Sequence, residues 1–429
     1  MLIKNTTVLN FSDLSTLENT DVLIEGSLIK KIGKNLEGDE IIDGSNFYTA
    51  PGLANTHAHV AMALLRGSAE DVTASEWFND YIWIYEKNLK PEDVYFGTLL
   101  GASEMLLAGI TTVFDHYFAM DWAFKAYKEI GMRADLAWAV FGKGGDAEKG
   151  YKSSLEFIEK FSGLDDRITI SLGPHSPYIC SEDFLKEIAD ISRESGLKIH
   201  IHISEEAWQV KKSLLEKGKT PIQYLNDLGL IKENTILAHA YYATSQDLGI
   251  VKSAGAKIAH APKTYLRFGD LNDFLPKAIE KGVTVGFATD GPASNGNLSI
   301  FEVARIAALL SKTCTRDAHK GKIEEIVPLL SSTQKFLNKP LGKVKEGYLA
   351  DLILIKKDSP RLNPQTNIFA NILYSISEKD IDTVIVDGKI VVKEGKLLTI
   401  DVGKVIKEAN KIAKRIVKRT SDKPMQTFG

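Results

Sequence analysis

Eight short apolar runs, separated by segments of helical pattern, constrain the fold of this chain more than any other feature. The runs are TAPGLANTH, TTVFDHY, RADLAWAV, ITISLGPHS, KIHIHISEE, TILAHAY, KIAHAP and TVGFATDG. Strands that alternate with helices form parallel sheets, and eight such units predict an α/β fold, the (β/α)8 TIM barrel, over residues 51–346. An open doubly wound sheet is the alternative, but it would need a glycine-rich phosphate turn after its first strand, where this sequence has none.

The segments between the runs carry helix start and stop signals. Pro91 opens PEDVYFGTLLGASEMLLAG at a position that suits a first helical turn. DWAFKAYKEIG, SEDFLKEIADISRESG and TSQDLGIVKSAG each close on a glycine, which is the residue that helices prefer just beyond their C-terminal end. We therefore expect these segments to be helices.

Both ends of the chain are rich in short β patterns. Residues 1–50 contain LIKNTTVLN and DVLIEGSLIKKIG, and residues 347–400 contain ADLILIKKD and DTVIVDGKIVVKEGKLL, whose Asp387-Gly388 pair is a strong hairpin signal. We expect the two ends to meet in one small β-sandwich domain. Residues 401–429 then form an amphipathic basic helix over 402–418, packed on the surface, followed by a loose polar tail.

Composition excludes several classes of function. A net charge of −3 over 429 residues gives no reason to expect attraction to nucleic acid or to a membrane surface. Two cysteines, Cys180 and Cys314, cannot form a disulfide framework and fit a reducing compartment. The N-terminus lacks a signal-type apolar core, and no apolar run has the length of a membrane span. We expect a soluble cytoplasmic protein.

The histidines are distributed unevenly. Eight of nine lie at the predicted C-terminal strand ends, where a barrel carries its active site. The polar residues at these ends are His57, His59, Asp115, His116, His175, His200, His202, Glu205, His239, His260 and Asp290. Residues two apart in a strand point to the same side, so His57 and His59 can both face the barrel axis.

Three imidazoles and one carboxylate around a position left for water suit a catalytic divalent metal, with zinc as the default. The order HxH on the first strand, HxxE on the fifth, His on the sixth and Asp on the eighth supports such a site. A single strand-end histidine is more often a hydrogen-bonded core residue. That structural interpretation is favoured for His116, His200 and His260.

Motifs along nearly the whole chain resemble those of a known family. They are PGLANTHAHVAMALLRG, SEWFNDYIWIYE, GITTVFDHY, GPHSPY, IHIHISEE, ILAHA, FATDGPASNGN and GYLADLILIK. The chain resembles the amidohydrolase superfamily, in its branch of aminohydrolases and chlorohydrolases, and particularly the methylthioadenosine/S-adenosylhomocysteine deaminases. The first motif and ATDG are highly specific, whereas the last marks only the shared sheet domain.

The resemblance implies a metal site and its ligands. These are His57, His59, His202 and Asp290. Relatives with two metals usually bridge them with a carboxylated lysine after the fourth strand, where this chain has GPHSPY and no lysine. We therefore expect one divalent ion per chain, zinc by preference and iron(II) as the alternative.

The resemblance also implies an activity. The chain would be a hydrolytic deaminase of an adenine-type nucleoside, such as methylthioadenosine, S-adenosylhomocysteine or adenosine, in which metal-activated water attacks the amino-bearing ring carbon. Asp290 would take a proton from that water, and Glu205 would carry protons to the ring and to the leaving amine. His239 would hydrogen-bond the water or the tetrahedral intermediate. Glu86 would hold the ribose hydroxyls, and His175 would contact the purine.

Two departures from the family pattern bear on the substrate. Thr264 and Tyr265 stand where Ser-Asn is usual, and the roles of these two residues stay open. The loop GKGGDAEKG lacks the arginine expected of members that clamp the carboxylate of S-adenosylhomocysteine, although Lys143 or Lys149 offers a less specific cation.

Other functions remain as alternatives. Another aminated heterocycle, such as a guanine-like base, a pterin or a triazine, is the alternative substrate, but Glu86 favours a ribose-bearing one. A non-enzymatic assembly protein on the same scaffold is disfavoured by the complete ligand set. Barrels with an exposed β domain often pair, which favours a homo-oligomer.

Overall fold

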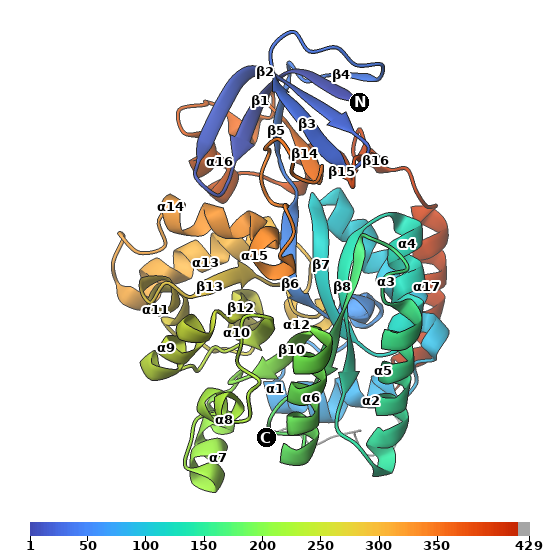
Figure 1. The fold of residues 1–429 in the computed structure, drawn as a ribbon, viewed down its shortest axis with the longest axis vertical. Coiled ribbons are helices and arrows are strands. Elements are labelled where there is room, and N and C mark those ends of the chain that lie inside the picture. The colour runs from blue at the N-terminus through green and yellow to red at the C-terminus, as the bar shows by residue number, and fades with distance from the viewer. Residues whose placement is uncertain (419–429) are drawn as a thin grey trace.

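The computed structural model describes residues 1–418, and the polar tail expected at the C-terminus lies outside them from residue 419 on. A β/α barrel forms the larger part of the molecule, and a sheet built from both chain ends sits against one end of it (Figure 1). No helix in the described part of the chain is both long enough and apolar enough to cross a membrane.

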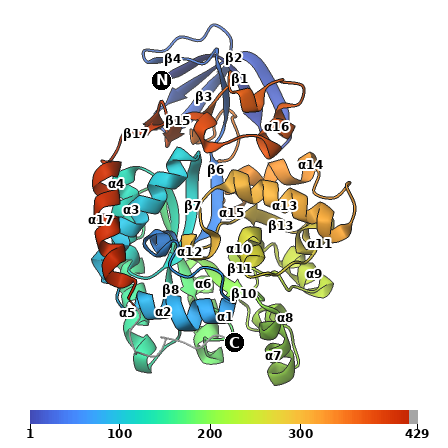
Figure 2. The same cartoon turned by 180° about the vertical axis from the view of Figure 1, so that it is seen from behind.

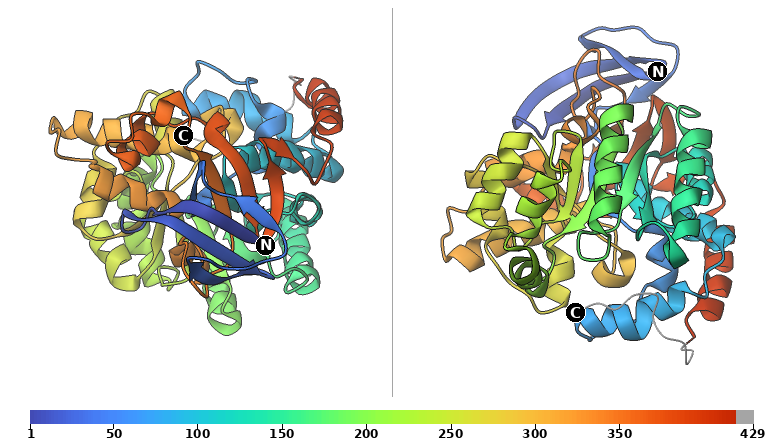
Figure 3. Two further views of the ribbon diagram at one scale, coloured as in Figure 1. Left: turned by 90° about the horizontal axis from the view of Figure 1, so that it is seen from above. Right: turned by 60° about the horizontal axis from the view of Figure 1, so that its bottom comes forward.

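Eight parallel strands form the barrel, in the sheet order β13-β12-β11-β10-β9-β8-β7-β6. They are β6 (Leu53–Ala58), β7 (Ile110–Tyr117), β8 (Arg133–Val140), β9 (Ile168–Pro174), β10 (Lys198–Ile203), β11 (Thr235–His239), β12 (Lys257–His260) and β13 (Thr284–Phe287). This confirms the predicted barrel and the order of its eight units. Figure 3 shows helices on the outside of these strands.

A few polar contacts close the barrel between its first and last strands. A bridge pairs Ala58 with Asp290 just beyond β13, and Thr56 Oγ1 donates to the Phe287 carbonyl at 2.9 Å. The side chain of Asn55 exchanges two hydrogen bonds with Thr289, at 2.7 and 3.1 Å. The seam therefore depends on side chains as well as on the backbone ladder.

Helices follow the strands, and their ends carry the expected caps. Gly131, Gly196 and Gly255 end α4, α6 and α9 with φ of 82°, 73° and 72°, the left-handed conformation that glycine adopts without strain. The α-helices are α1 (Ala74–Glu76), α2 (Trp83–Glu86), α3 (Pro91–Leu107), α4 (Met120–Ile130), α5 (Glu148–Phe161), α6 (Glu182–Ser195), α7 (Ala207–Lys217), α8 (Pro221–Asp227), α9 (Ser245–Ala254), α10 (Pro262–Arg267), α11 (Phe274–Glu280), α12 (Pro292–Asn295), α13 (Ile300–Thr315), α14 (Ile323–Ile326), α15 (Thr333–Leu337), α16 (Ile368–Tyr374) and α17 (Val402–Ile416). Short 3-10 turns are η1 (Val60–Leu65), η3 (Gly145–Ala147), η4 (Val327–Ser331), η5 (Pro360–Leu362) and η6 (Glu378–Asp380), and η2 (Trp77–Ile82) is a π-helix.

The terminal sheet joins the two chain ends, as expected. Its order is β17-β16-β15-β14-β5-β1-β2-β3, with β4 beside β1. Its strands are β1 (Leu2–Asn10), β2 (Ser15–Glu25), β3 (Leu28–Gly33), β4 (Ile41–Asp43), β5 (Phe47–Pro51), β14 (Leu352–Lys356), β15 (Ile381–Val386), β16 (Lys389–Lys393) and β17 (Lys396–Leu397). A bridge between Leu28 and Leu349 brings β3 back towards β14, so one hydrogen-bonded sheet folds over its own apolar core. The predicted hairpin at Asp387-Gly388 links β15 to β16.

The run TAPGLANTH belongs to two sheets. Gly52 N donates to the Asp351 carbonyl beside the terminal sheet, and Leu53 N donates to the Gly109 carbonyl beside the barrel. A Cβ at residue 52 would lie 2.2 Å from Thr111 Oγ1, so only glycine fits this crossing. An extended chain has the same period in either sheet, so the Pro51-Gly52 pair marks the crossing in the sequence and the strand period does not.

The C-terminal helix α17 packs along α3 on the barrel surface (Figure 2). Val405, Ala409, Ile412 and Ile416 are buried at spacings of three and four residues, while its lysines face outward. The predicted surface-packed amphipathic helix is therefore confirmed, with its end at Ile416 rather than at residue 418.

Candidate active site

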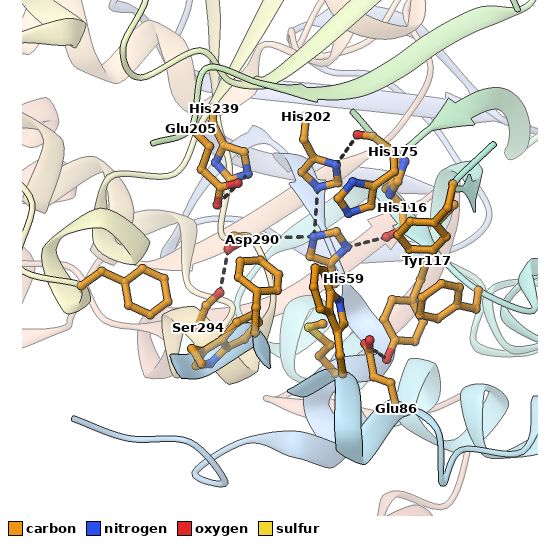
Figure 4. A pocket seen from close by; sticks show the side chains of 18 residues that line it. His59, Glu86, His116, Tyr117, His175, His202, Glu205, His239, Asp290 and Ser294 are labelled. Atoms are coloured by element: carbon orange, nitrogen blue, oxygen red, sulfur yellow. Dashed lines mark hydrogen bonds and ion pairs between the residues drawn. The ribbon is translucent and has the colours of Figure 1, made fainter. Parts of the chain in front are cut away.

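The strand-end histidines converge at the end of the barrel away from the terminal sheet (Figure 4). His57 and His59 come from the end of β6, His202 from β10, and Asp290 from the turn after β13. The chain segment with α1, η2 and α2 lies across this end of the barrel and contributes pocket side chains. The ninth histidine, His319, lies in the loop after α13, away from the pocket.

The four expected ligands lie close together. Asp290 Oδ1 lies 3.2 Å from His59 Nε2 and 3.6 Å from His57 Nε2. His202 Nε2 lies 3.3 Å from His59 Nε2. His57, His59 and Asp290 form one group that could hold a metal ion, and His202 belongs to two further such groups, one with His57 and His239 and one with His59 and His116.

In each of the three expected histidine ligands, the Nδ1 atom already has a polar partner. His59 Nδ1 donates to the His116 carbonyl at 2.5 Å, and His202 Nδ1 donates to the His175 carbonyl at 2.9 Å. His57 Nδ1 lies 2.8 Å from His200 Nε2, while the buried Nε2 of His57 has no hydrogen-bond partner. Partners of this kind fix the ring so that the other nitrogen meets the metal, and the residues therefore fit a bound ion.

The carboxylate of Asp290 is oriented by two hydroxyls. Its Oδ2 accepts from Ser294 Oγ at 2.6 Å and from Thr264 Oγ1 at 3.2 Å. Oδ1 is thereby turned towards the imidazoles. Thr264 is one of the residues that departs from the family pattern, and its hydroxyl still takes part in this network.

Glu205 and His239 stand together beside this centre. Glu205 Oε1 lies 3.7 Å from His239 Nε2, and both side chains are buried. Burial, together with the negative charge of Asp290, raises the pKa of Glu205 well above its ordinary value. Burial lowers the pKa of His239 to about 4. The pair can thus offer a carboxylic acid and a neutral imidazole near neutral pH.

Glu86 and His175 line other walls of the same pocket. Glu86, at the end of α2, accepts a hydrogen bond from the Tyr117 hydroxyl at 2.6 Å, and burial raises its pKa to about 7. The ring of His175 stacks on Phe141 with centroids 4.7 Å apart, and burial lowers the pKa of His175 to about 3. Figure 4 shows Glu86 across the pocket from Glu205.

The family model described as "Amidohydrolase family" matches residues 48–391. The chain belongs to the amidohydrolase family. It is thus a hydrolase whose family acts on carbon–nitrogen bonds, and its histidine and aspartate cluster supports a divalent metal in this site.

Relatives of this amidohydrolase match it along almost its whole length. It is 36% identical to the 5-methylthioadenosine/S-adenosylhomocysteine deaminase of Caldanaerobacter subterraneus, covering 97% of this chain and 99% of that protein. It is 38% identical to the 5'-deoxyadenosine deaminase of Methanocaldococcus jannaschii, covering 91% and 95%.

Solved structures share its fold. An adenosine deaminase from Xanthomonas campestris with bound zinc aligns with a TM-score of 0.92 at 24% identity, over 97% of this chain and 98% of that one. An atrazine chlorohydrolase from Arthrobacter aurescens, complexed with zinc, aligns with a TM-score of 0.88 at 23% identity, over 96% and 99%.

The amidohydrolase pocket also contains residues that the sequence did not single out. Tyr117 and Ser294 hold the carboxylates of Glu86 and Asp290. Tyr117 directly follows His116 at a strand end, which is the one sequence signal that could have revealed it. Several aromatic rings complete the walls: Trp77, Phe78, Trp83, Phe118, Phe141 and Phe268.

Other residues that the sequence analysis considered for the site lie outside the pocket wall. His200 stands behind His57, and His260 packs against Phe274 with ring centroids 5.0 Å apart. Neither side chain lines the pocket. Lys143 Nζ pairs with Glu187 at 2.9 Å and is half exposed, and neither it nor Lys149 reaches the pocket wall.

Proposed function

We propose that this amidohydrolase is a metal-dependent deaminase that hydrolyses the ring amino group of an adenine-type nucleoside. The observation that carries the proposal is a single pocket with two carboxyl groups on opposite sides. Glu205 stands beside the ligand cluster, and Glu86 lies across the pocket where it can bind a ribose diol. The names of relatives at 36–38% identity, which describe deaminases of such nucleosides, support it.

We further propose that His57, His59, His202 and Asp290 hold one ion per chain, zinc by preference and iron(II) as the alternative. Two distances support this set: the Nε2 atoms of His57 and His59 lie 3.6 and 3.2 Å from Asp290 Oδ1, and His202 Nε2 lies 3.3 Å from His59 Nε2. When bound there, the ion supplies a water whose pKa is lowered towards neutrality. At the end of β9, Pro174 is followed by His175, so no lysine stands there to bridge a second ion.

The proton transfers are assigned to Glu205 and Asp290. Asp290 takes the first proton of the attacking water, and Glu205, held as an acid by burial, protonates the ring nitrogen next to the amino-bearing carbon. That nitrogen keeps its proton in the product. Of the two water protons, one reaches the amine, which leaves as ammonia, and the other restores Glu205 to its acid form.

The remaining polar groups bind and orient the substrate. His239 donates to the oxygen that adds to the ring, where negative charge develops in the transition state. Glu86 accepts hydrogen bonds from the ribose hydroxyls, and His175 meets the purine edge. The aromatic walls cover the flat faces of the nucleoside and exclude water.

The test is ammonia release by zinc-loaded protein across a substrate panel. The panel contains adenosine, 5'-deoxyadenosine, methylthioadenosine, S-adenosylhomocysteine, adenine, guanine, a pterin and an aminotriazine. We expect turnover of nucleosides with an intact ribose diol, and kcat/KM for adenine at least about tenfold lower, since a lost pair of charge-assisted hydrogen bonds is worth about 1.5–3 kcal/mol each. If the enzyme turned over free bases, pterins or triazines but no nucleoside, the proposal would be overturned.

A further inference from the structure

Behind His239 lies a tyrosine that the family pattern does not supply. Tyr265, on α10, places its hydroxyl 3.0 Å from His239 Nδ1. Both side chains are buried, with exposed fractions of 3% and 1%. The ring of Tyr265 is held in place by stacking on Tyr241, with centroids 3.8 Å apart and planes 19° apart.

The direction of this hydrogen bond follows from the surroundings of the hydroxyl. Within residues 1–418, the one acceptor at hydrogen-bond distance from the buried phenolic hydroxyl is His239 Nδ1. If Nδ1 donated instead, the single hydrogen of this buried phenol would have no acceptor, which costs free energy. Tyr265 is therefore the donor, and His239 Nδ1 is the acceptor.

A donated hydrogen bond at Nδ1 determines which tautomer a neutral imidazole takes. With Nδ1 accepting, the ring hydrogen of His239 sits on Nε2, the atom that faces the pocket 3.7 Å from Glu205 Oε1. An N–H at that place can donate to an oxygen but cannot bind a metal ion. His239 is thus separated from the ligand group, although its nitrogen lies near those of His57 and His202.

The backbone conformation at His239 gives the hydrogen bond from Tyr265 a structural role. His239 and Ala240 both have left-handed φ, of 73° and 49°, which costs free energy for residues other than glycine. Such residues persist where the surrounding structure holds them. The bond from Tyr265 is one contact that fixes the ring at the end of this turn.

We propose that Tyr265 is a positioning residue that holds His239 as the Nε2–H tautomer, so that its N–H points at the oxygen added to the substrate. The inference about the tautomer stands on this contact, while its effect on turnover rests on the proposed deamination.

The first test compares Tyr265→Phe with Tyr241→Phe in zinc-loaded enzyme. Each change removes one buried hydroxyl and keeps the ring, but the Tyr241 hydroxyl accepts from the Asn272 backbone N–H and does not contact His239. We expect Tyr265→Phe to lower kcat about 10- to 100-fold, as a lost second-layer partner does, with KM and zinc content within about twofold of wild type. Tyr241→Phe should keep kcat within about twofold. A wild-type kcat in Tyr265→Phe, or a loss confined to KM, would overturn the proposal.

The second test needs no substrate. In zinc-loaded wild-type protein with 15N-labelled histidine, the resonances of His239 are assigned by their loss in His239→Gln. We expect the Nε2-protonated form, and in Tyr265→Phe a mixture of both tautomers. A wild-type ring protonated at Nδ1 would refute the tautomer assignment. Because this measurement is independent of turnover, it separates a failure of this inference from a failure of the proposed deaminase activity.

Discussion

The backbone N–H of Asp290 donates to the His57 carbonyl at 3.1 Å, which joins the last strand of the barrel to the first. The same pairing sets Asp290 Oδ1 3.6 Å from His57 Nε2 and 3.2 Å from His59 Nε2. Closing the barrel therefore also brings Asp290 beside two of the histidines proposed as metal ligands. A ligand set from strands so far apart in sequence cannot form before the barrel does.

Metal content tests the ligand set. We expect purified protein to carry about one divalent ion per chain by elemental analysis, because the four proposed ligands can hold one ion and no lysine follows β9 to bridge a second. His57→Ala should lose most of this ion. His260→Ala is the matched control and should keep it, since the buried His260 ring packs against Phe274 and does not line the pocket. Two ions per chain, or loss of metal in His260→Ala, would contradict the mononuclear site.

Glu205→Gln tests the proton shuttle. Glutamine keeps the shape of the side chain but cannot carry a proton, so kcat should fall about 10²- to 10⁴-fold while the metal content stays unchanged. Glu206→Gln, one residue further along, is the control because Glu206 does not line the pocket. Its kcat should stay within about threefold of wild type. Normal turnover by Glu205→Gln would eliminate this residue as the shuttle.

The pH dependence of KM tests Glu86. Burial raises its pKa to about 7 despite the hydrogen bond from Tyr117, so the group is protonated below that pH and ionised above it. The ionised carboxylate can accept from both ribose hydroxyls, and KM should therefore fall as pH rises, by about tenfold between pH 6 and 8 as the ionised fraction grows.

Two controls isolate this effect from other titrations in the pocket. Glu86→Gln should abolish the slope of KM without changing the pH profile of kcat, because the amide does not ionise in this range. A substrate that lacks the 2′ and 3′ hydroxyls should show no slope even with wild-type enzyme. A slope that survives in Glu86→Gln would show that another group is responsible.

A buried ion pair between the barrel and the terminal sheet provides a test of stability. Arg133, at the start of β8, donates to both oxygens of Asp351 at 2.8 and 2.9 Å and to Asp387 at 3.1 Å, and its own exposed fraction is 1%. Arg133→Met should lower the free energy of unfolding in urea by about 3–5 kcal/mol, because it leaves Asp351 buried without its partner.

The control for this change is an arginine–aspartate ion pair on the surface. Arg193 and Asp190 are more than half exposed, so Arg193→Met should cost at most about 1 kcal/mol. Equal effects of the two substitutions would mean that burial does not strengthen the contact between the barrel and the terminal sheet.

The barrel, its eight units and the terminal sheet could all be predicted, because each rests on local periodicity. Strand and helix periods, and glycines such as Gly196 and Gly255 at helix ends, are written within a few neighbouring residues. The crossing near Gly52 was expected from the domain boundary at residue 51, although the strand period alone does not mark it because both strands of TAPGLANTH are extended. Only the partners, Asp351 on one side and Gly109 on the other, assign them to different sheets.

At the site, the sequence placed histidines and acids at strand ends, and the structure brings His57, His59, His202 and Asp290 close together, with Glu205 beside His239. The sequence could not show the contacts that orient these side chains. Ser294 and Thr264 on Asp290, His200 on His57 and Tyr117 on Glu86 each come from another segment of the chain.

The sequence alone therefore determined the fold class, the family resemblance and the residue types available for chemistry, because these depend on local pattern and on motifs. The tertiary structure decided which nitrogen of each histidine is free, which carboxyl oxygen faces the imidazoles and which carboxyl groups are held as acids. These properties depend on burial and on hydrogen-bond partners distant in sequence. The contact between Tyr265 and His239, which exists only once β11 and β12 lie side by side, is the clearest case.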